Sequence, residues 1–240
     1  MKTTIKTLTL SAVVLASASA QSAVLLSEDF EGAATPSDVG FAGWIANLNW
    51  NYGYGRPLDN NEYDTASIKG SAVTGSSDML NVWYPSEDSG CMTNSACELQ
   101  STVYNNLSIG AESGPTTYTF NFNYSGSSES PVDASTFGSI IAGLKVNGNS
   151  DPGQVWANDT MDIKVLGGDT TLLSGSLSIT SDGNWGGSQI VPYIQSYVQG
   201  VDGGIAYPNM AVWVDNVSVT SVPVPAAAWL MGSALLGLAG

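Results

Sequence analysis

The sequence predicts an all-β domain, an antiparallel β-sandwich of about 200 residues that lies between an N-terminal leader and a C-terminal apolar segment. Two observations predict this fold. Short segments with strand-like alternation recur along the middle of the chain, where helical periodicity is scarce. Stretches rich in Gly, Asn and Asp separate these segments and favour turns. Many short strands joined by turns are typical of packed antiparallel sheets.

The clearest strand is the segment 116–124, TTYTFNFNY, in which aromatic residues alternate with Thr and Asn. Such alternation predicts a strand with one buried face. Similar runs occur at 23–30, 78–85, 139–146, 161–167, 171–180 and 210–219. The segment 189–200 contains Pro192 and fits either an interrupted strand or a short helix.

The chain begins with the features of a secretory signal peptide. Lys2 and Lys6 form a positive region, residues 8–15 an apolar region, and small residues end at Ala20. This order predicts cleavage after Ala20, with Ala23 as the alternative site. The apolar part is too short for a permanent membrane span.

The chain carries a net charge of −15 and contains no histidine. An acidic surface repels phosphate backbones, so a nucleic-acid partner is not expected. The absence of histidine excludes His-based catalytic triads and His-ligated zinc sites. Hard divalent cations are the partners that such a surface would attract.

The only two cysteines are Cys91 and Cys97, which lie in a polar stretch. In an exported chain two cysteines this close predict a local disulfide, with free thiols as the alternative. A bridge over so short a loop would rigidify the loop more than it would stabilise the fold.

The sandwich domain, 21–220, is expected to end near Thr220. Residues 221–225 contain alternating prolines, which predict an extended spacer. Residues 226–240 carry no charge and are a few residues shorter than the roughly 20 that a spanning helix needs. We therefore expect an apolar helix that directs the protein to the membrane, and not an element of the core.

The last nineteen residues, VPVPAAAWLMGSALLGLAG, resemble the PEP-CTERM sorting signal of Gram-negative bacteria. The positions that carry the match include Val222, Pro223, Pro225, Trp229 and Gly232. The resemblance implies processing by an exosortase-type membrane enzyme and delivery to the cell envelope or extracellular matrix. The signal normally ends in a basic cluster, which this sequence lacks, and that departure implies a truncated or impaired signal. An unprocessed membrane anchor is the alternative.

The middle domain resembles, more loosely, the jelly-roll carbohydrate-binding modules related to galactose-binding domains. Three motifs carry this resemblance: EDFEG at 28–32 followed by Trp44, DGNW at 182–185, and VWVDNVSV at 212–219. It implies a jelly-roll sandwich in which Trp185 belongs to the core, and extracellular polysaccharide as a ligand.

Asp215 is expected to lie among apolar side chains, where an isolated carboxylate is unfavourable. Strict alternation places it on the same strand face as Trp213, Val217 and Val219, where a carboxylate must be paired, bound to metal or displaced by a bulge. The resemblance implies a structural Ca²⁺ held by Asp215 with Glu31, and with Asp29 or Glu28. An edge position facing solvent is the alternative.

The stretch NWNYGYGRP offers candidate sugar-stacking side chains. They are Trp50, Tyr52 and Tyr54, with Arg56 close behind and Trp83 as a further candidate. Rings spaced by two residues lie on one side of an extended segment, and flat rings beside polar donors suit a sugar. The alternative is that these rings fill the core under a long loop.

Catalysis has little support in the sequence. Asp59, Glu62 and Asp64 could form a glycosidase pair, but an acidic chain offers many accidental pairs. We therefore expect a non-catalytic, envelope- or matrix-associated protein that binds carbohydrate and holds a structural calcium. The alternatives are a purely structural matrix protein and, less supported, a glycan hydrolase.

Overall fold

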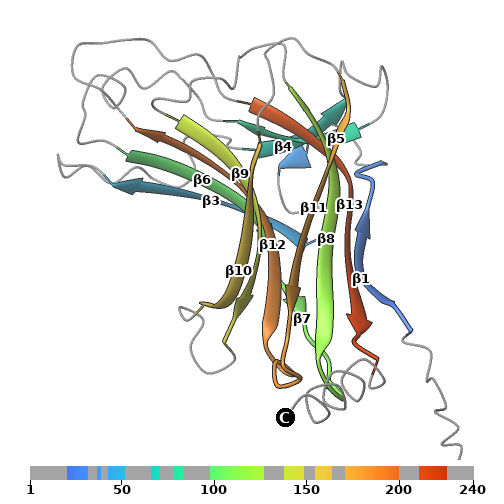
Figure 1. Cartoon of the computed structure of the whole chain (residues 1–240). Helices are drawn as coiled ribbons and strands as arrows, with labels where there is room; N and C mark the ends of the chain where they lie inside the picture. Colours follow the sequence, from blue (N-terminus) through green and yellow to red (C-terminus); the bar gives the residue numbers. More distant parts are fainter. Residues whose placement is uncertain are drawn as a thin grey trace, which may run out of the picture.

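The chain folds into a jelly-roll β-sandwich of two antiparallel sheets (Figure 1). The structure is a computed structural model that describes residues 21–31, 37–38, 43–51, 66–70, 78–83, 98–126, 138–148, 155–163, 171–199 and 211–225. No α-helix lies within these ranges, and therefore none there could cross a membrane. The prediction of an all-β sandwich is confirmed.

One sheet has seven strands in the order β11-β8-β13-β5-β4-β2, and β1 also pairs with β13. The bounds of these strands are β1 Ala23–Glu28, β2 Ser37–Asp38, β4 Ala66–Gly70, β5 Asp78–Trp83, β8 Thr116–Gly126, β11 Leu173–Thr180 and β13 Ala211–Pro223. Strand β13 therefore has two partners along one edge, first β5 and then β1.

The other sheet has six strands in the order β10-β9-β12-β6-β3, and β7 also pairs with β12. The bounds of these strands are β3 Trp44–Asn51, β6 Glu98–Asn105, β7 Leu107–Ser108, β9 Gly138–Asn147, β10 Val155–Ile163 and β12 Gln189–Gln199. Side chains from both sheets form one core cluster, so the sheets pack face to face.

The alternation in β8 organises this core. Phe120 and Phe122 are buried with their ring centroids 4.8 Å apart, and Tyr118 lies on the same inner face. Thr117, Thr119 and Asn121, which alternate with these rings, face outward. Asn121 accepts a hydrogen bond from the hydroxyl of Ser176 on β11. The burial pattern predicted for this strand is confirmed.

The segment 189–200, for which the sequence allows an interrupted strand or a short helix, contains an uninterrupted strand, β12, at the centre of its sheet. Pro192 has no N–H to donate to a neighbouring strand. The neighbour on that side is interrupted between β6, which pairs at Tyr193, and β7, which pairs at Ile190. The break in the neighbouring strand lets β12 accommodate the proline in its middle.

Two expected boundaries differ from the observed ones. Strand β10 begins at Val155, six residues before the predicted run. The sequence does not predict this start, because the residues that alternate there are mostly polar or small. Strand β13 continues through Ser221 and Val222 to Pro223, the first part of the expected spacer. A proline is tolerated there because it ends the strand, and the N–H of Val224 donates to the carbonyl of Pro115.

Candidate functional site

Two loops pack against each other at one end of the sandwich. Residues 109–115 connect β7 to β8, and residues 181–188 connect β11 to β12. Their backbones are hydrogen-bonded: the N–H of Ile109 donates to Ser188 at 2.9 Å, and the N–H of Gly187 donates to Ile109 at 3.0 Å. The two loops therefore form one unit, which we call the paired loops.

Glycines permit this close packing of the paired loops. Gly183 has a φ of +93°, and a Cβ placed on it would lie 2.9 Å from the carbonyl carbon of Gly114. A Cβ on Gly186 would lie 3.2 Å from the carbonyl oxygen of Gly110. Larger residues at these positions would separate the loops, so the glycines of DGNWGG serve backbone-to-backbone contact.

The carboxylate of Glu112 adds side-chain hydrogen bonds between the paired loops. Its Oε1 accepts hydrogen bonds from the hydroxyls of Tyr118 at 2.7 Å and Ser181 at 2.6 Å, and its Oε2 accepts one from the N–H of Trp185 at 2.7 Å. Burial, with the hydrogen bond to Glu112 and its charge, raises the pKa of Tyr118, so this hydroxyl stays protonated and donates.

The tryptophan of the second loop belongs to the core. Trp185 is 8 % exposed and stacks on Tyr118 with ring centroids 6.1 Å apart. Its backbone N–H faces Glu112 while its ring anchors the loop in the sandwich. The expectation that Trp185 is a core residue agrees with this position.

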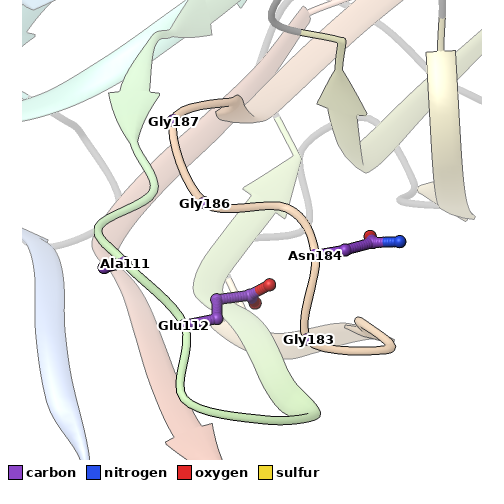
Figure 2. Close-up of a pocket in the computed structure, with 6 residues that line it drawn as sticks. All are labelled: Ala111, Glu112, Gly183, Asn184, Gly186 and Gly187. Carbon is purple, nitrogen blue, oxygen red and sulfur yellow. The ribbon is translucent and has the colours of Figure 1, made fainter.

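Two shallow pockets lie on either side of Asn184. One, of about 320 Å³, is lined by Trp156, Asp182, Asn184 and Trp185. The other, of about 400 Å³, is lined by Ala111, Glu112, Gly183, Asn184, Gly186 and Gly187, and Figure 2 shows the Glu112 side chain extending toward the opposite loop. The side chain of Asn184 donates a hydrogen bond to Asp182 at 3.0 Å, which orients both groups.

Trp156 gives the first pocket an aromatic wall. It lies on β10 and is 40 % exposed. A Cβ on Gly148 would lie 2.8 Å from its Nε1, so the indole rests directly against the backbone of this glycine. An indole that is supported on a neighbouring backbone yet partly open to solvent is suited to stacking on a ligand.

Asp215 lies at a β-bulge, at the point where β13 changes partner. The register of β13 against β8 shifts between Asp215 and Ser218, and Asn216 has a φ of +48°. The bulge removes Asp215 from the face that carries Val217 and Val219, which belong to the core cluster. Placing Asp215 on one face with those valines was therefore wrong; the bulge intervenes, as Asn tolerates a left-handed backbone.

The carboxylate of Asp215 remains buried, with 6 % of the residue exposed. It accepts hydrogen bonds from the backbone N–H of Asn216 at 2.7 Å and from its side-chain amide at 3.0 Å. Burial raises the pKa of Asp215; the N–H of Asn216 opposes this, and the charges of Glu31 and Asp29 reinforce it. The expected calcium ligands thus influence one another electrostatically.

The acids of the opening strand form a tight turn beside this corner. Glu28 accepts a hydrogen bond from the N–H of Phe30 at 2.8 Å, and Asp29 accepts one from the N–H of Glu31 at 3.2 Å. Within the described ranges, no three carboxylate, cysteine or histidine side chains are grouped closely enough to hold a metal ion. The calcium site stays a prediction.

Of the other sequence-predicted site residues, Val222, Pro223 and Pro225 lie in or just after β13, and the rest lie where side chains are not described or outside the described ranges. Trp50 is in β3 and Trp83 ends β5. The remaining candidates outside the described residues are Tyr52, Tyr54, Arg56, Cys91, Cys97, Trp229 and Gly232. Their roles in stacking, disulfide formation and sorting stay predictions.

Sequence reasoning missed the residues that the pockets bring together. Glu112 lies in the polar stretch GAESGP, and Trp156 in a strand that was not predicted to begin so early. The motif DGNW indicates the jelly-roll resemblance and a core position for Trp185, and by itself it does not indicate a pocket. Glycines flanking polar residues on two separate turns are the signal that could have indicated paired loops.

Comparisons with known proteins support the fold alone. No protein-family model and no curated protein sequence matches the chain. Among solved structures, a Stig cyclase, Fisc from Fischerella sp. TAU, in complex with a pyrrolidinylidene indole, has a TM-score of 0.50 at 12% identity, covering 85% of this chain and all of that chain. The likeness places this chain among jelly-roll sandwiches.

Carbohydrate-binding modules are also among the similar structures. TmCBM61 bound to β-1,4-galactotriose has a TM-score of 0.40 at 9% identity, covering 75% of this chain and 88% of that chain. The CBM22-2 xylan-binding domain of Paenibacillus barcinonensis Xyn10C has a TM-score of 0.41 at 15% identity, covering 82% and 98%. At these scores the site must be argued from this chain's own residues.

Proposed function

We propose that this protein is an exported carbohydrate-binding protein without catalytic activity, and that it holds a glycan against Trp156, Asp182 and Asn184. A sugar ring has an apolar C–H face and a rim of hydroxyls. It is therefore bound by a flat aromatic side chain flanked by hydrogen-bonding groups.

The partly exposed indole of Trp156 beside the Asp182–Asn184 pair is the observation that carries this proposal. Asp182 accepts hydrogen bonds from hydroxyls, and the amide oxygen of Asn184 can accept another. Both side chains belong to a loop that Glu112 fixes, so little ordering is needed when a ligand binds.

A binding screen with a matched pair of variants tests this function. Purified protein is incubated with a panel of insoluble polysaccharides, and affinities for soluble oligosaccharides are measured by titration calorimetry. Trp156→Ala should weaken binding about tenfold, because loss of the stacked indole should cost about 1.4 kcal/mol. Leu173→Ala, an exposed apolar residue at the far end of β11, should bind as the wild type does.

The aromatic stretch around Trp50 is the alternative place for the glycan. Trp50→Ala and Tyr52→Ala are measured in the same titrations. Binding that is lost in these variants and retained in Trp156→Ala would move the ligand to that stretch and overturn the assignment to the pocket. Binding that is retained in Trp156→Ala and also in Trp50→Ala and Tyr52→Ala would exclude the pocket and the aromatic stretch alike.

A structural protein of the extracellular matrix is the alternative function. Failure to bind any glycan in the panel, by protein with normal folding, would favour it. Hydrolysis of a glycan that is lost in Asp59→Ala or Glu62→Ala would favour an enzyme instead.

We further propose a structural Ca²⁺ at the corner formed by Asp215, Glu31 and Asp29. Asp215 is buried and feels the negative charges of Glu31 and Asp29, which a cation would offset, and calcium also takes backbone carbonyl ligands. Added Ca²⁺ should raise the thermal midpoint of the wild type, and raise it less in Asp215→Ala. Equal shifts of the thermal midpoint in the two proteins would mean that calcium does not bind at this corner.

The export pathway is the last part of the proposal. The signal peptide and the PEP-CTERM-like end would direct the protein to an exosortase-type enzyme and then to the cell envelope or matrix. Residues 222–240, with and without an added basic end, are fused to a secreted reporter. Retention of the fusion with the basic end supports sorting, and equal release of both fusions into the medium argues against it.

A further inference from the structure

The pocket beyond Asn184 has a different character from the one beside Trp156. Its walls are the backbones of Gly183, Gly186 and Gly187 with the small side chain of Ala111, so a ligand can approach closely. Among the residues that the structure describes, Glu112 is the only ionisable side chain that lines it (Figure 2). The described lining of this shallow pocket therefore carries one negative charge.

Glu112 is fixed and incompletely saturated with hydrogen bonds. Two hydroxyls and a backbone N–H donate to it, and none of these donors is charged. A carboxylate has about four lone-pair positions, and here Oε1 accepts two hydrogen bonds and Oε2 one. One acceptor position on Oε2 remains for a ligand, at an atom whose place is already set.

The charge of this region selects among ligand groups. Asp182 adds a second carboxylate in the neighbouring pocket, and the whole chain carries a net charge of −15. A sulfated or uronic acid unit would be repelled here. A cationic donor would both neutralise Glu112 and form a charge-assisted hydrogen bond with it, which is stronger than a bond from a neutral hydroxyl.

We propose that this pocket binds the protonated amino group of an amino-sugar unit whose chain continues over Asn184 to Trp156. The inference rests on the proposed carbohydrate binding and names the class of glycan, one that contains unacetylated hexosamine. Asn184 lines both pockets, so one oligosaccharide can occupy them together.

Three β-1,4-linked hexasaccharides that differ at one group test the inference. They are oligomers of glucosamine, N-acetylglucosamine and glucose. Their affinities are measured by calorimetry at a pH where the amines are protonated, in low and high salt. The glucosamine oligomer should bind about tenfold more tightly than either neutral one; high salt should weaken this preference without abolishing it, because a direct hydrogen bond to Glu112 adds to the long-range attraction.

Charge-matched variants separate this pocket from the general acidity of the chain. Glu112→Gln should abolish the preference for glucosamine, while Asp162→Asn, an exposed acid on β10, removes the same charge and should leave it unchanged. If both substitutions lower the affinity equally, the attraction is non-specific and the inference is overturned.

Because Glu112 also holds the paired loops, a second variant guards against misfolding of Glu112→Gln. Ala111→Lys places an ammonium beside Glu112 and removes none of its hydrogen bonds; it too should abolish the preference. A glucosamine oligomer that binds no more tightly than the neutral ones would overturn this inference, even if Trp156-dependent binding of another glycan upholds the proposed function. Absence of any glycan binding would overturn both.

Discussion

Glu112 and Asp215 are two sheltered carboxylates that the fold treats in opposite ways. Glu112 receives hydrogen bonds from three residues that lie 6, 69 and 73 positions away in the sequence, all of them uncharged donors. Asp215 receives its hydrogen bonds from its own neighbour Asn216 and is repelled by Glu31 and Asp29. The first carboxylate cross-links distant parts of the chain, whereas the second is buried with like charges nearby and bonds only to its neighbour.

The difference explains why the candidate binding site lies near Glu112. Distant partners cross-link two loops, so the loop that carries Asp182 and Asn184 is held in place. A carboxylate that bonds only its neighbour fixes a bulge and nothing beyond it. The stability of the paired loops should therefore depend on Glu112 and not on a bound ion. The stability of the corner formed by Asp215, Glu31 and Asp29 should depend on pH and on calcium.

Removing Glu112 should give the largest effect. Glu112→Ala leaves the Tyr118 and Ser181 hydroxyls and the Trp185 N–H without their acceptor. We expect a loss of about 3 kcal/mol in the free energy of unfolding, since each bond to a charged group contributes roughly 1.5 to 3 kcal/mol and water replaces part of it. Calorimetry should show a midpoint lower by roughly 6 to 12 °C, and a change under about 2 °C would contradict the role of Glu112.

Separating the paired loops sterically should have the next largest effect. Gly183→Ala adds a Cβ in a backbone conformation that favours glycine, and against the backbone of Gly114. We expect a loss of about 2 kcal/mol in denaturant unfolding, together with weaker glycan binding. Gly110→Ala is the matched control, because a Cβ there meets nothing within 4 Å. Equal losses in the two variants would argue against close loop packing.

The bulge beside Asp215 predicts a smaller effect. Asn216→Val puts a β-branched residue at a φ of +48° and should cost about 1 to 2 kcal/mol, whereas Asn216→Gly permits this φ and should cost less. Urea unfolding of both variants measures the difference. A valine variant as stable as the glycine variant would mean that the left-handed conformation at this position is absent.

The sequence was sufficient for the sandwich because alternation over long strands such as β8 is strong and local. It was insufficient for β3 and β10, where polar or small residues weaken the pattern. The site was missed for a related reason: Glu112 and Trp185 are far apart in the sequence, and the hydrogen bond between them is a property of the folded chain. The bulge at Asp215 lies between the parts of β13 that pair with β5 and with β1, an arrangement that alternation in one strand cannot reveal.

The pH dependence of Asp215 should give the smallest effect. Because burial raises its pKa in the folded protein, the folded state binds its proton more strongly than the unfolded state does. The stability that this group contributes is present below its unfolded pKa and is lost as pH rises through the folded pKa. With a chelator present, Asp215→Asn should match the wild type in acid and become more stable than it toward neutral pH. A difference that stays constant with pH would contradict this sign.

Titration calorimetry measures whether a glycan binds in the pockets at the paired loops, as we propose. The oligosaccharide that binds most tightly in the screen is titrated into the wild type, Trp156→Ala and Leu173→Ala. We expect the wild type and Leu173→Ala to have equal affinities and Trp156→Ala to bind about tenfold more weakly or not at all. Equal affinities in all three proteins would contradict the claim.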